Sequence, residues 1–319
     1  FAELLVLDST DPAQIGTVEA AVTFEQTAFI VASKSGSTLE PNILKAYFYQ
    51  RMVEAVGAEQ AAAHFIAITD PESAVEQAAR KDGYRFIFHG VPEIGGRFSA
   101  LSNFGVVPAA VIGIDCRRFL ENAQQMVSAC AVTTAADNPG VLLGCILGVA
   151  TLNGRDKLTF IASPQVASMG AWLEQLIAES TGKQGKGVLP LDGEPVGSPE
   201  VYGDDRVFVY LRHDATADAD QDRAVEQLEK AGLPVIRIDM SDVYNVGQEM
   251  FRWEIATAVI GSLIKVNPFD QPDVEASKIE TRKLMGAFET DRNLPGEVPL
   301  AEDGQLTLYA DARNAADLG

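Results

Sequence analysis

Short apolar runs alternate with helical patterns along most of this chain, and no other feature limits its fold as strongly. Over residues 1–112, the expected strands are 4–7, 28–33, 64–69, 84–88 and 108–112. The expected helices between them are about 11–22, 38–57 and 72–82. A helix that joins two strands returns the chain to the same edge of a sheet, so the strands run parallel. The pattern therefore predicts an α/β fold whose mostly parallel sheet is covered by helices on both faces.

The alternation restarts near residue 130, which indicates two similar α/β lobes. A long helical stretch, roughly 115–152, is interrupted near Pro139, which is expected to begin a new helix. Further strands are expected at 158–162, 206–211 and 233–238, helices at 219–231 and 243–265, and a last short strand at 303–309. The predicted organisation is a first lobe at 1–129, a second lobe at 130–268 and a C-terminal segment at 269–319.

The composition of the chain supports buried cores and argues against several partners. Hydrophobic residues make up 47% of the 319 residues. The formal net charge of −20 disfavours a nucleic-acid partner, because nucleic acids attract basic surfaces. The longest apolar helix, 141–152, is too short to span a membrane. The three cysteines lack metal-ligand spacing and are interpreted as buried thiols, so a cytoplasmic protein without a metal site is predicted.

A hydroxyl-rich segment, residues 33–38, stands between an expected strand and an expected helix. This segment, here called the hydroxyl loop, consists of Ser33, Lys34, Ser35, Gly36, Ser37 and Thr38. A helix N-terminus exposes unpaired N–H groups, hydroxyls add donors, and glycine lets the backbone approach an anion. An ordinary helix cap is the alternative, but a cap needs only one hydroxyl. Four hydroxyls and a lysine together favour a phosphate site, which must be locally basic in so acidic a chain.

Four segments, in this order, resemble those of glucose-6-phosphate isomerases, which have a two-lobed sugar-isomerase fold. They are the hydroxyl loop, Gly95-Gly96-Arg97-Phe98-Ser99, then Glu179-Ser180-Thr181-Gly182-Lys183 with Gly193-Glu194-Pro195, and finally residues 267–278. The stretch Tyr202-Gly203-Asp204-Asp205-Arg206 is most similar to the isomerase part of bacterial bifunctional transaldolase/glucose-6-phosphate isomerases. The resemblance implies two sugar-isomerase (SIS) lobes, each a flavodoxin-like three-layer sandwich. It also implies interconversion of glucose 6-phosphate and fructose 6-phosphate through a cis-enediolate, without a metal or redox cofactor.

The resemblance implies roles for individual residues. Glu194, in the Gly-Glu-Pro turn, is expected to be the base that moves a proton between C1 and C2. Arg97 is expected to stabilise the enediolate and orient the base, and Lys278 is expected to act near the ring oxygen. The substrate phosphate is expected to be held by Ser33, Lys34, Ser35 and Thr38. Without the resemblance, Glu194, Arg97 and Lys278 would be interpreted as solvated surface charges.

Two departures from the family pattern qualify these expectations. The chain begins just after the position of a glycine-rich loop that also binds the phosphate, and it stops short of the family's end, so an internal fragment is expected. The histidine that many family members carry seven positions after the catalytic glutamate is replaced by Val201. His213, at a strand end, is one candidate for ring opening, and Glu200 or water are the others. Family members are commonly dimers, so a homodimer is expected.

Other functions stay open from the sequence alone. A non-catalytic sugar-phosphate-binding SIS module or regulator would keep the hydroxyl loop and lose the base, although Glu194, Arg97 and Lys278 together argue against it. The isomerase lobes of an amidotransferase that makes glucosamine 6-phosphate would carry a different C-terminal lysine signature. The sequence leaves undecided whether mannose 6-phosphate is a second substrate and whether a transaldolase domain lies upstream.

Overall fold

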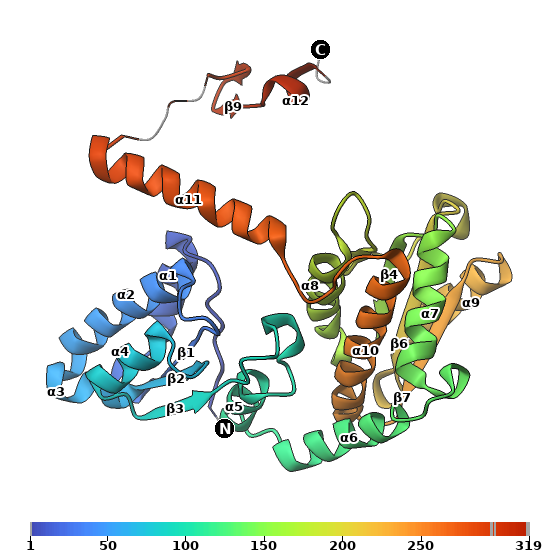
Figure 1. Cartoon of the computed structure of the whole chain (residues 1–319), viewed down its shortest axis with the longest axis horizontal. Coiled ribbons are helices and arrows are strands. Elements are labelled where there is room, and N and C mark those ends of the chain that lie inside the picture. The colour runs from blue at the N-terminus through green and yellow to red at the C-terminus, as the bar shows by residue number, and fades with distance from the viewer. Residues whose placement is uncertain (1, 294–295, 297, 317–319) are drawn as a thin grey trace. The chain divides into compact units, whose positions relative to one another are not determined.

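Two parallel sheets and their helices make up one compact unit of the chain, which ends at Phe269 (Figure 1). A second, smaller unit begins at Asp270. The computed structural model describes residues 2–293, 296 and 298–316. Both parallel sheets therefore belong to the first unit, whereas the second unit has a small sheet of its own.

The first sheet has three parallel strands in the order β1-β2-β3. They are β1 (Phe29–Ala32), β2 (Phe65–Thr69) and β3 (Phe86–His89), which confirms three of the predicted strands. Ile66 pairs with Ile30 on one side and with Phe86 on the other, so β2 is the central strand. All five residues of β2 are buried, as expected for a strand that is covered on both faces.

Helices that precede or connect the three strands pack on the first sheet. They are α1 (Pro12–Ala21), α2 (Leu39–Val56), α3 (Ala58–Ala61) and α4 (Ala74–Asp82). Phe48 and Met52 of α2 and Val75 and Ala79 of α4 form one core with Phe65 of β2. Helix α5 (Asn103–Val111) also packs against β2. The predicted helices 11–22, 38–57 and 72–82 are thereby confirmed within a few residues.

Two strands predicted for the first lobe are wrong. Residues 108–112 lie in or next to α5, whose N-terminus is capped by Ser102 through a hydrogen bond from the amide of Phe104. Pro108 cannot donate to a strand ladder, which already weakens a strand at this place. Residues 4–7 form no strand, because the sheet has no fourth neighbour for them, and Leu7 alone of these residues packs on the core.

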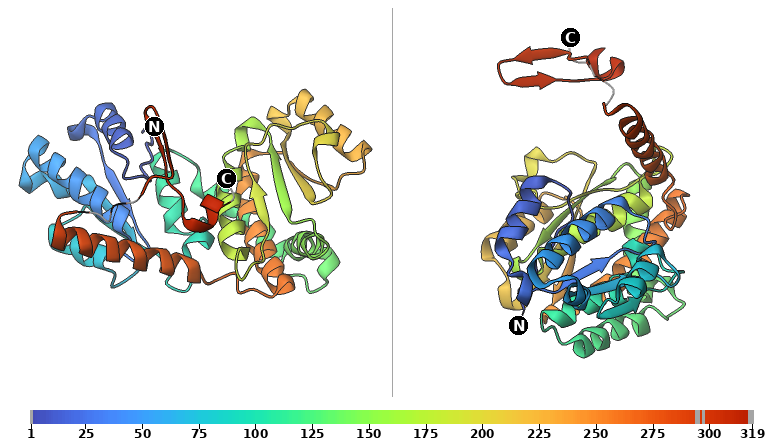
Figure 2. Two further views of the ribbon diagram at one scale, coloured as in Figure 1. Left: turned by 90° about the horizontal axis from the view of Figure 1, so that it is seen from above. Right: turned by 90° about the vertical axis from the view of Figure 1, so that its left-hand side faces the viewer.

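The second sheet has four parallel strands in the order β5-β4-β6-β7 (Figures 1 and 2). The strands are β4 (Lys157–Ala162), β5 (Leu189–Leu191), β6 (Arg206–His213) and β7 (Val235–Met240). The associated helices are α6 (Cys116–Ala129), α7 (Pro139–Leu152), α8 (Met169–Thr181), α9 (Ala219–Lys230) and α10 (Val246–Ile264). Sequence analysis predicted β4, β6 and β7 but missed β5, which is short and has Pro190 at its centre.

The second sheet is the middle of three layers. On β6, Val209 belongs to the core that the sheet shares with α7, α8 and α10. Phe208 and Tyr210 point to the opposite face, because side chains alternate along a strand, and they pack with Val225 and Leu228 of α9. This arrangement confirms the predicted α/β class. The boundaries of the two predicted lobes stay a prediction.

Helices α7 and α10 approach each other closely through a row of glycines. Gly140, Gly144 and Gly148 lie about one turn apart on α7, and a Cβ atom at Gly144 would lie 2.6 Å from the carbonyl oxygen of Ala256 on α10. Pro139 begins α7, as the sequence predicts. The glycines let the helix before β4 pack directly on the helix after β7.

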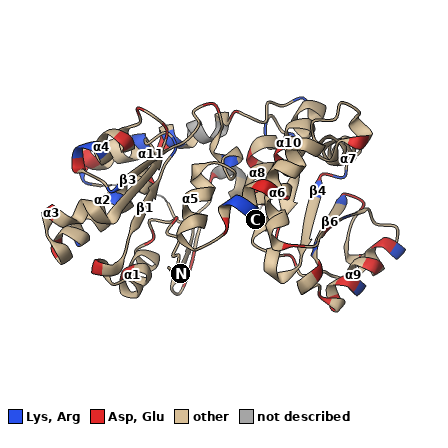
Figure 3. Ribbon diagram, turned by 90° about the horizontal axis from the view of Figure 1, so that it is seen from below, with Lys and Arg blue, Asp and Glu red and all other residues tan. Residues whose placement is uncertain are grey.

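Charged residues of both signs are interleaved on the helices of the first unit. Figure 3 shows this mixture on α4 and α9. Ion pairs within these helices include Arg80–Glu76 at 2.6 Å and Lys230–Glu226 at 3.2 Å. The Lys230–Glu226 pair is exposed and adds little stability, whereas the Glu76 side chain is buried and its pair with Arg80 is only partly open to solvent.

The second unit contains α11 (Pro272–Asp291), the strands β8 (Ala301–Asp303) and β9 (Leu306–Leu308), and α12 (Ala312–Ala316). The strand predicted at 303–309 is confirmed as β9, whereas its partner β8, with which it forms an antiparallel hairpin, was missed. Gly304, with φ +59°, lies between the two strands. Glycine adopts this left-handed conformation without steric cost, so the chain can reverse there.

Among the described helices, none is long and apolar enough to cross a membrane. Within residues 2–293, 296 and 298–316, no group of three or more His, Cys, Asp and Glu side chains is placed to hold a metal ion. Cys116, Cys130 and Cys145 are free and only partly buried, whereas the sequence predicted buried thiols.

Candidate active site

The hydroxyl loop connects β1 to α2 at the carboxyl end of the first sheet, which confirms the predicted strand–loop–helix arrangement. Ser33 follows β1 directly, and Thr38 is the N-cap residue of α2 without a capping hydrogen bond from its side chain. The first N–H groups of α2 thus lack a side-chain acceptor from Thr38, and they carry the positive end of the helix dipole. The hydroxyl oxygens of Ser35 and Ser37 lie 2.9 Å apart in the same loop.

Two backbone carbonyl oxygens of the hydroxyl loop accept hydrogen bonds, whereas one buried hydroxyl group has no partner in the part of the chain that the structure describes. Asn42 of α2 donates to the carbonyl oxygens of Gly36 and Thr38, at 3.0 and 2.8 Å. Gly36 has φ +70°, and a Cβ atom there would lie 2.9 Å from the amide nitrogen of Val75, so the loop packs tightly on α4. The buried Oγ atom of Ser33 has no partner among the described residues. A loop with spare donors suits an anion.

Lys34 is engaged by the protein itself. Its Nζ atom donates to both carboxylate oxygens of Asp70, at 2.7 and 2.6 Å, and to the carbonyl oxygen of Val91 at 2.8 Å. The side chains of Lys34 and Asp70 are 19% and 18% exposed. An ammonium group has three N–H donors, and three acceptors meet them here.

Arg97 lies in a buried crossing of three distant segments. Its Nη1 atom is 2.5 Å from Oε1 of Glu179, its Nε atom donates to Oγ of Ser180 at 3.0 Å, and its Nη2 atom donates to the carbonyl oxygen of Pro268 at 3.0 Å. The indole nitrogen of Trp172 donates to the carbonyl oxygen of Arg97 at 3.3 Å. The Arg97 side chain is 7% exposed and that of Glu179 is 27% exposed, so the carboxylate remains open to solvent while the arginine is held.

Lys183 fixes the chain next to this crossing. Its buried ammonium donates to the carbonyl oxygen of Asn267, and Lys186 donates to the carbonyl oxygen of Ile264 at 3.0 Å. The rings of Phe98 and Phe269 pack with their centroids 5.2 Å apart. Three of the predicted motifs therefore meet in one place: 95–99, 179–183 and the start of 267–278.

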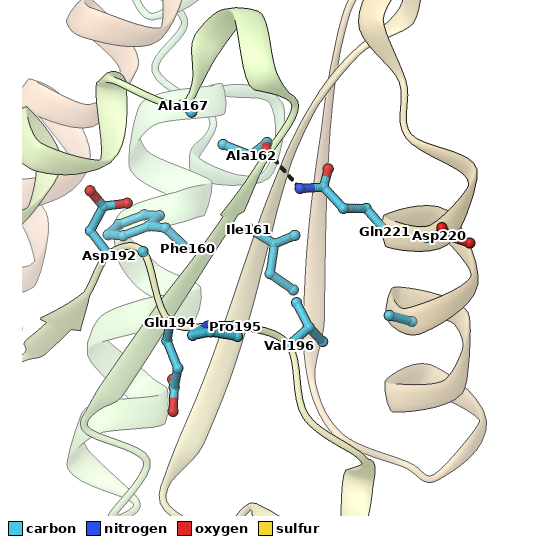
Figure 4. Close-up of a pocket in the computed structure, with 12 residues that line it drawn as sticks. Phe160, Ile161, Ala162, Ala167, Asp192, Glu194, Pro195, Val196, Asp220 and Gln221 are labelled. Atoms are coloured by element: carbon cyan, nitrogen blue, oxygen red, sulfur yellow. Dashed lines mark hydrogen bonds between the residues drawn. The ribbon is translucent and has the colours of Figure 1, made fainter.

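Glu194 contacts a different set of residues from Arg97. Its carboxylate lies 2.6 Å from Arg206 and 3.2 Å from the hydroxyl of Thr159. It borders a cavity of about 400 Å³ between the ends of β4 and α9. Figure 4 shows its carboxylate pointing away from Gln221 and Asp220. The expected orientation of Glu194 by Arg97 stays a prediction, whereas Glu179 contacts that arginine directly.

The remaining predicted residues are dispersed. His213 ends β6 with 3% exposure, and its ring nitrogen Nδ1 lies 3.0 Å from the hydroxyl of Thr216. Hydrogen bonds from its own backbone amide and from the Ser198 hydroxyl lower the pKa of Glu200. Lys278 is an exposed residue of α11 in the second unit.

Sequence analysis did not single out Glu179, the carboxylate that contacts Arg97, although it quoted the motif that contains it. The available signal was the buried helix around it, because Ser180 and Thr181 are fully buried and fix the direction of the preceding side chain. Asp70 was missed as well, and its signal was a carboxylate directly after a buried parallel strand, at the sheet edge where the hydroxyl loop lies.

Comparisons with known proteins agree on one family. The family model described as phosphoglucose isomerase matches residues 2–190. A glucose-6-phosphate isomerase of Parabacteroides distasonis is 30% identical over 295 residues, which cover 80% of this chain and 65% of that protein. One of Rubrobacter xylanophilus is 30% identical over 317 residues, which cover 88% and 73%. The chain thus spans just under two thirds of the first relative and about three quarters of the second.

Solved structures have the same fold. A hypothetical protein from Thermus thermophilus superposes with a TM-score of 0.79 at 25% identity, over 88% of this chain and 76% of the other. A glucose-6-phosphate isomerase from Chlamydia trachomatis superposes with a TM-score of 0.72 at 22% identity, over 88% and 63%.

Proposed function

Because the chain belongs to the phosphoglucose isomerase family, we propose that it interconverts glucose 6-phosphate and fructose 6-phosphate. The observation that carries the proposal is the pair of Arg97 and Glu179, a buried guanidinium 2.5 Å from a carboxylate that stays partly exposed. An aldose–ketose isomerisation needs such a pair: a base for a carbon-bound proton and a fixed cation for the oxyanion that forms.

Glu179 is the base in this proposal. Its carboxylate takes the proton from C2 of the open-chain aldose, and the electron pair of the C–H bond forms the cis-enediolate. The proton of the C2 hydroxyl moves to O1, and the same carboxyl group returns its proton to C1, which leaves the carbonyl at C2 and gives the ketose. Arg97 stabilises the negative oxygen of the enediolate, and its bonds to Ser180 and Pro268 hold the guanidinium in one orientation.

The choice of Glu179 over Glu194 rests on their partners. Glu194 forms an ion pair with Arg206 and a hydrogen bond with Thr159, a combination typical of a structural carboxylate. Glu179 instead contacts the arginine that both the sequence pattern and its burial favour for the oxyanion. The sequence-derived role of Glu194 stays as the competing assignment.

The hydroxyl loop binds the substrate phosphate in this proposal. The spare Oγ atom of Ser33, the hydroxyls of Ser35 and Thr38 and the first amides of α2 are the donors that support it. Fixing the phosphate places the sugar carbons reproducibly against the base, which is how binding contributes to the rate. Lys278 is proposed to act at the ring oxygen, since His213 is buried against Thr216.

The protein is further proposed to work without a cofactor, as a homodimer in the cytoplasm. Sedimentation equilibrium at micromolar concentration tests the assembly, and a monomer over that range would exclude the dimer.

The experiment compares Glu179→Gln with Glu194→Gln in a coupled assay of fructose 6-phosphate formation. We expect E179Q to lower kcat by about 10²–10⁴-fold, because a positioned general base contributes that much. The E194Q variant is the matched control, and we expect its kcat to stay within about threefold of the wild type, as for a residue outside the reacting groups.

A large loss of kcat in E194Q, together with a kcat near that of the wild type in E179Q, would assign the base to Glu194. Wild-type turnover in both variants would exclude both carboxylates. A wild-type protein that binds glucose 6-phosphate but forms no fructose 6-phosphate would favour a binding module over an isomerase.

A further inference from the structure

Lys34 and Asp70 form a closed pair beside the hydroxyl loop. The ammonium of Lys34 meets both carboxylate oxygens of Asp70 and the carbonyl oxygen of Val91, all within 2.8 Å. All three of its donors are thereby used, so a phosphate in the loop would have to break one of these bonds to reach the ammonium.

The position of Asp70 is fixed from several sides. Its amide donates to the carbonyl oxygen of Lys34 at 3.0 Å, and the hydroxyl of the preceding Thr69 donates to the carbonyl oxygen of Ser33 at 2.6 Å. A Cβ atom at Gly90 would lie 2.4 Å from Oδ1 of Asp70, so the carboxylate occupies space that only a glycine leaves. The pair therefore ties together the carboxyl ends of all three strands of the first sheet, since Val91 follows β3 closely.

The charges of the pair nearly cancel at a site proposed for an anion. An uncompensated carboxylate next to the hydroxyl loop would repel a phosphate, and the net charge of −20 offers no help from the surroundings. Because the Lys34 ammonium lies 2.6 Å from the Asp70 carboxylate, the two groups together present only a small net charge to the loop.

We propose that Asp70 is a positioning residue of the phosphate site, which holds the Lys34 ammonium against the sheet edge so that hydroxyls and amides of residues 33–38, not the lysine, receive the phosphate. This inference rests on the proposed function, because it takes the hydroxyl loop as the place where the sugar phosphate binds. It changes the role of Lys34 from a phosphate ligand to a tether of the loop.

A double-mutant cycle of Lys34→Met, Asp70→Asn and the double variant tests the proposal. Dissociation constants for glucose 6-phosphate and for inorganic phosphate are measured by calorimetry in the intact protein. We expect K34M to weaken both by at least about tenfold, because it leaves the Asp70 carboxylate unpaired beside the anion. We expect the K34M/D70N variant to recover most of that loss, within about threefold of D70N, since no unpaired charge remains.

A direct lysine–phosphate bond gives a different pattern. In that case D70N would bind phosphate more tightly than the wild type, and K34M/D70N would bind no better than K34M. Either result overturns the proposal, as does a wild-type protein that fails to bind both phosphates.

Steady-state kinetics separate positioning from a general structural effect. The phosphate contacts are the same in the bound substrate and in the transition state, so the variants are expected to raise KM and leave kcat within about threefold. Equal melting temperatures of the wild type and the double variant show that the fold is kept. If the wild type binds inorganic phosphate and the cycle shows recovery but no isomerisation occurs, the proposed reaction fails and the role of Asp70 stands.

Discussion

Gly90 leaves space for a carboxylate of the proposed phosphate site. It has an ordinary backbone conformation, so alanine would be tolerated by the backbone itself. A Cβ atom there, however, would lie 2.4 Å from Oδ1 of Asp70 and 2.7 Å from Cε2 of Phe104. The space at Gly90 thus belongs to the carboxylate that holds Lys34.

Gly90→Ala is therefore expected to displace the Asp70 carboxylate and weaken the Lys34 pair. The KM for glucose 6-phosphate should rise by about five- to tenfold in the wild-type background, because the phosphate loop loses its tether. In an Asp70→Ala background the same change should cost less, since no carboxylate is left to displace. Equal effects in both backgrounds would show that Gly90 acts through Phe104 alone.

Glu249 of α10 is a buried carboxyl group with a different consequence. It is 2% exposed, Oε2 has no partner among the described residues, and Nη2 of Arg252 lies 3.1 Å from Oε1. Burial raises the pKa of Glu249 to about 7, with Arg252 opposing the shift. Burial also raises the pKa of Glu254 to about 8. The neutral forms of both groups are favoured in the folded state.

The sign of the pH effect follows from these raised values. Because folding raises the pKa of Glu249, the neutral carboxyl group adds to the free energy of unfolding. This contribution is fully present below the ordinary pKa of 4.5 and is lost as the pH rises through about 7. Glu249→Gln should therefore raise the free energy of unfolding at pH 8 by up to about 3 kcal/mol and change little below pH 5. Denaturant titrations at several pH values test this, with the exposed Glu226→Gln as a control that should show no such trend.

The site could be predicted from the sequence only where a motif itself carried the chemistry. The hydroxyl loop was identified from its own residues, whereas Arg97 was singled out only through the family resemblance, since a lone arginine after a turn would be interpreted as a solvated surface charge. The choice between Glu179 and Glu194 depended on which carboxylate the fold brings to Arg97, at a sequence separation that no local pattern records. For Asp70 the sequence offered only its place directly after a buried strand, whereas its partner Lys34 follows a different strand.

At the scale of elements, the contact between α7 and α10 is set by backbone proximity. A methyl group at Gly144 would lie 2.6 Å from both the carbonyl oxygen of Ala256 and Cβ of Val259. A backbone oxygen cannot rotate away as the end of a flexible side chain can, so the two helices would have to separate.

Gly144→Ala is expected to destabilise the protein by about 1–3 kcal/mol in spite of the better helix propensity of alanine, because the core would be overpacked. Gly16→Ala on α1 is the matched control, since nothing lies within 4 Å of its Cβ position. That change should be neutral or stabilise by up to about 1 kcal/mol. Thermal unfolding of both variants measures the difference, and equal melting temperatures would show that the helices can adjust.

Elements with a regular apolar pattern were predictable, and the failures have physical causes. All strands with a buried, β-branched or aromatic run were found, as were the long helices α2, α9 and α10. The 20-residue helix α11 was missed. Residues 108–112 have the apolarity of a strand but fold as a helix, because the Ser102 cap and the proline act over a longer stretch than the run itself. Strand β5 was missed because a strand of three residues is too short to show a recognisable pattern of apolar and polar residues.

At the scale of the whole molecule, the first unit joins two sheets through buried polar contacts between distant segments. Arg97 belongs to the chain that follows the first sheet, whereas Glu179 and Ser180 lie on α8 of the second sheet. Lys186 donates to the carbonyl oxygen of Ile264 at the end of α10, where unpaired carbonyl groups favour cations, and Lys183 donates to that of Asn267 beyond the helix. The arginine is thus placed by the completed second sheet and not by its own surroundings.

The bond between Arg97 and Pro268 also has a meaning for protein synthesis. A ribosome must extend the polypeptide by 171 residues after Arg97 before the acceptor carbonyl exists. Until then the guanidinium lacks one of the hydrogen bonds that orient it, even if the first sheet has already folded. Nascent chains that end between these two positions carry the hydroxyl loop and the arginine without the Pro268 contact, so the guanidinium gains this contact only near the end of this unit's translation.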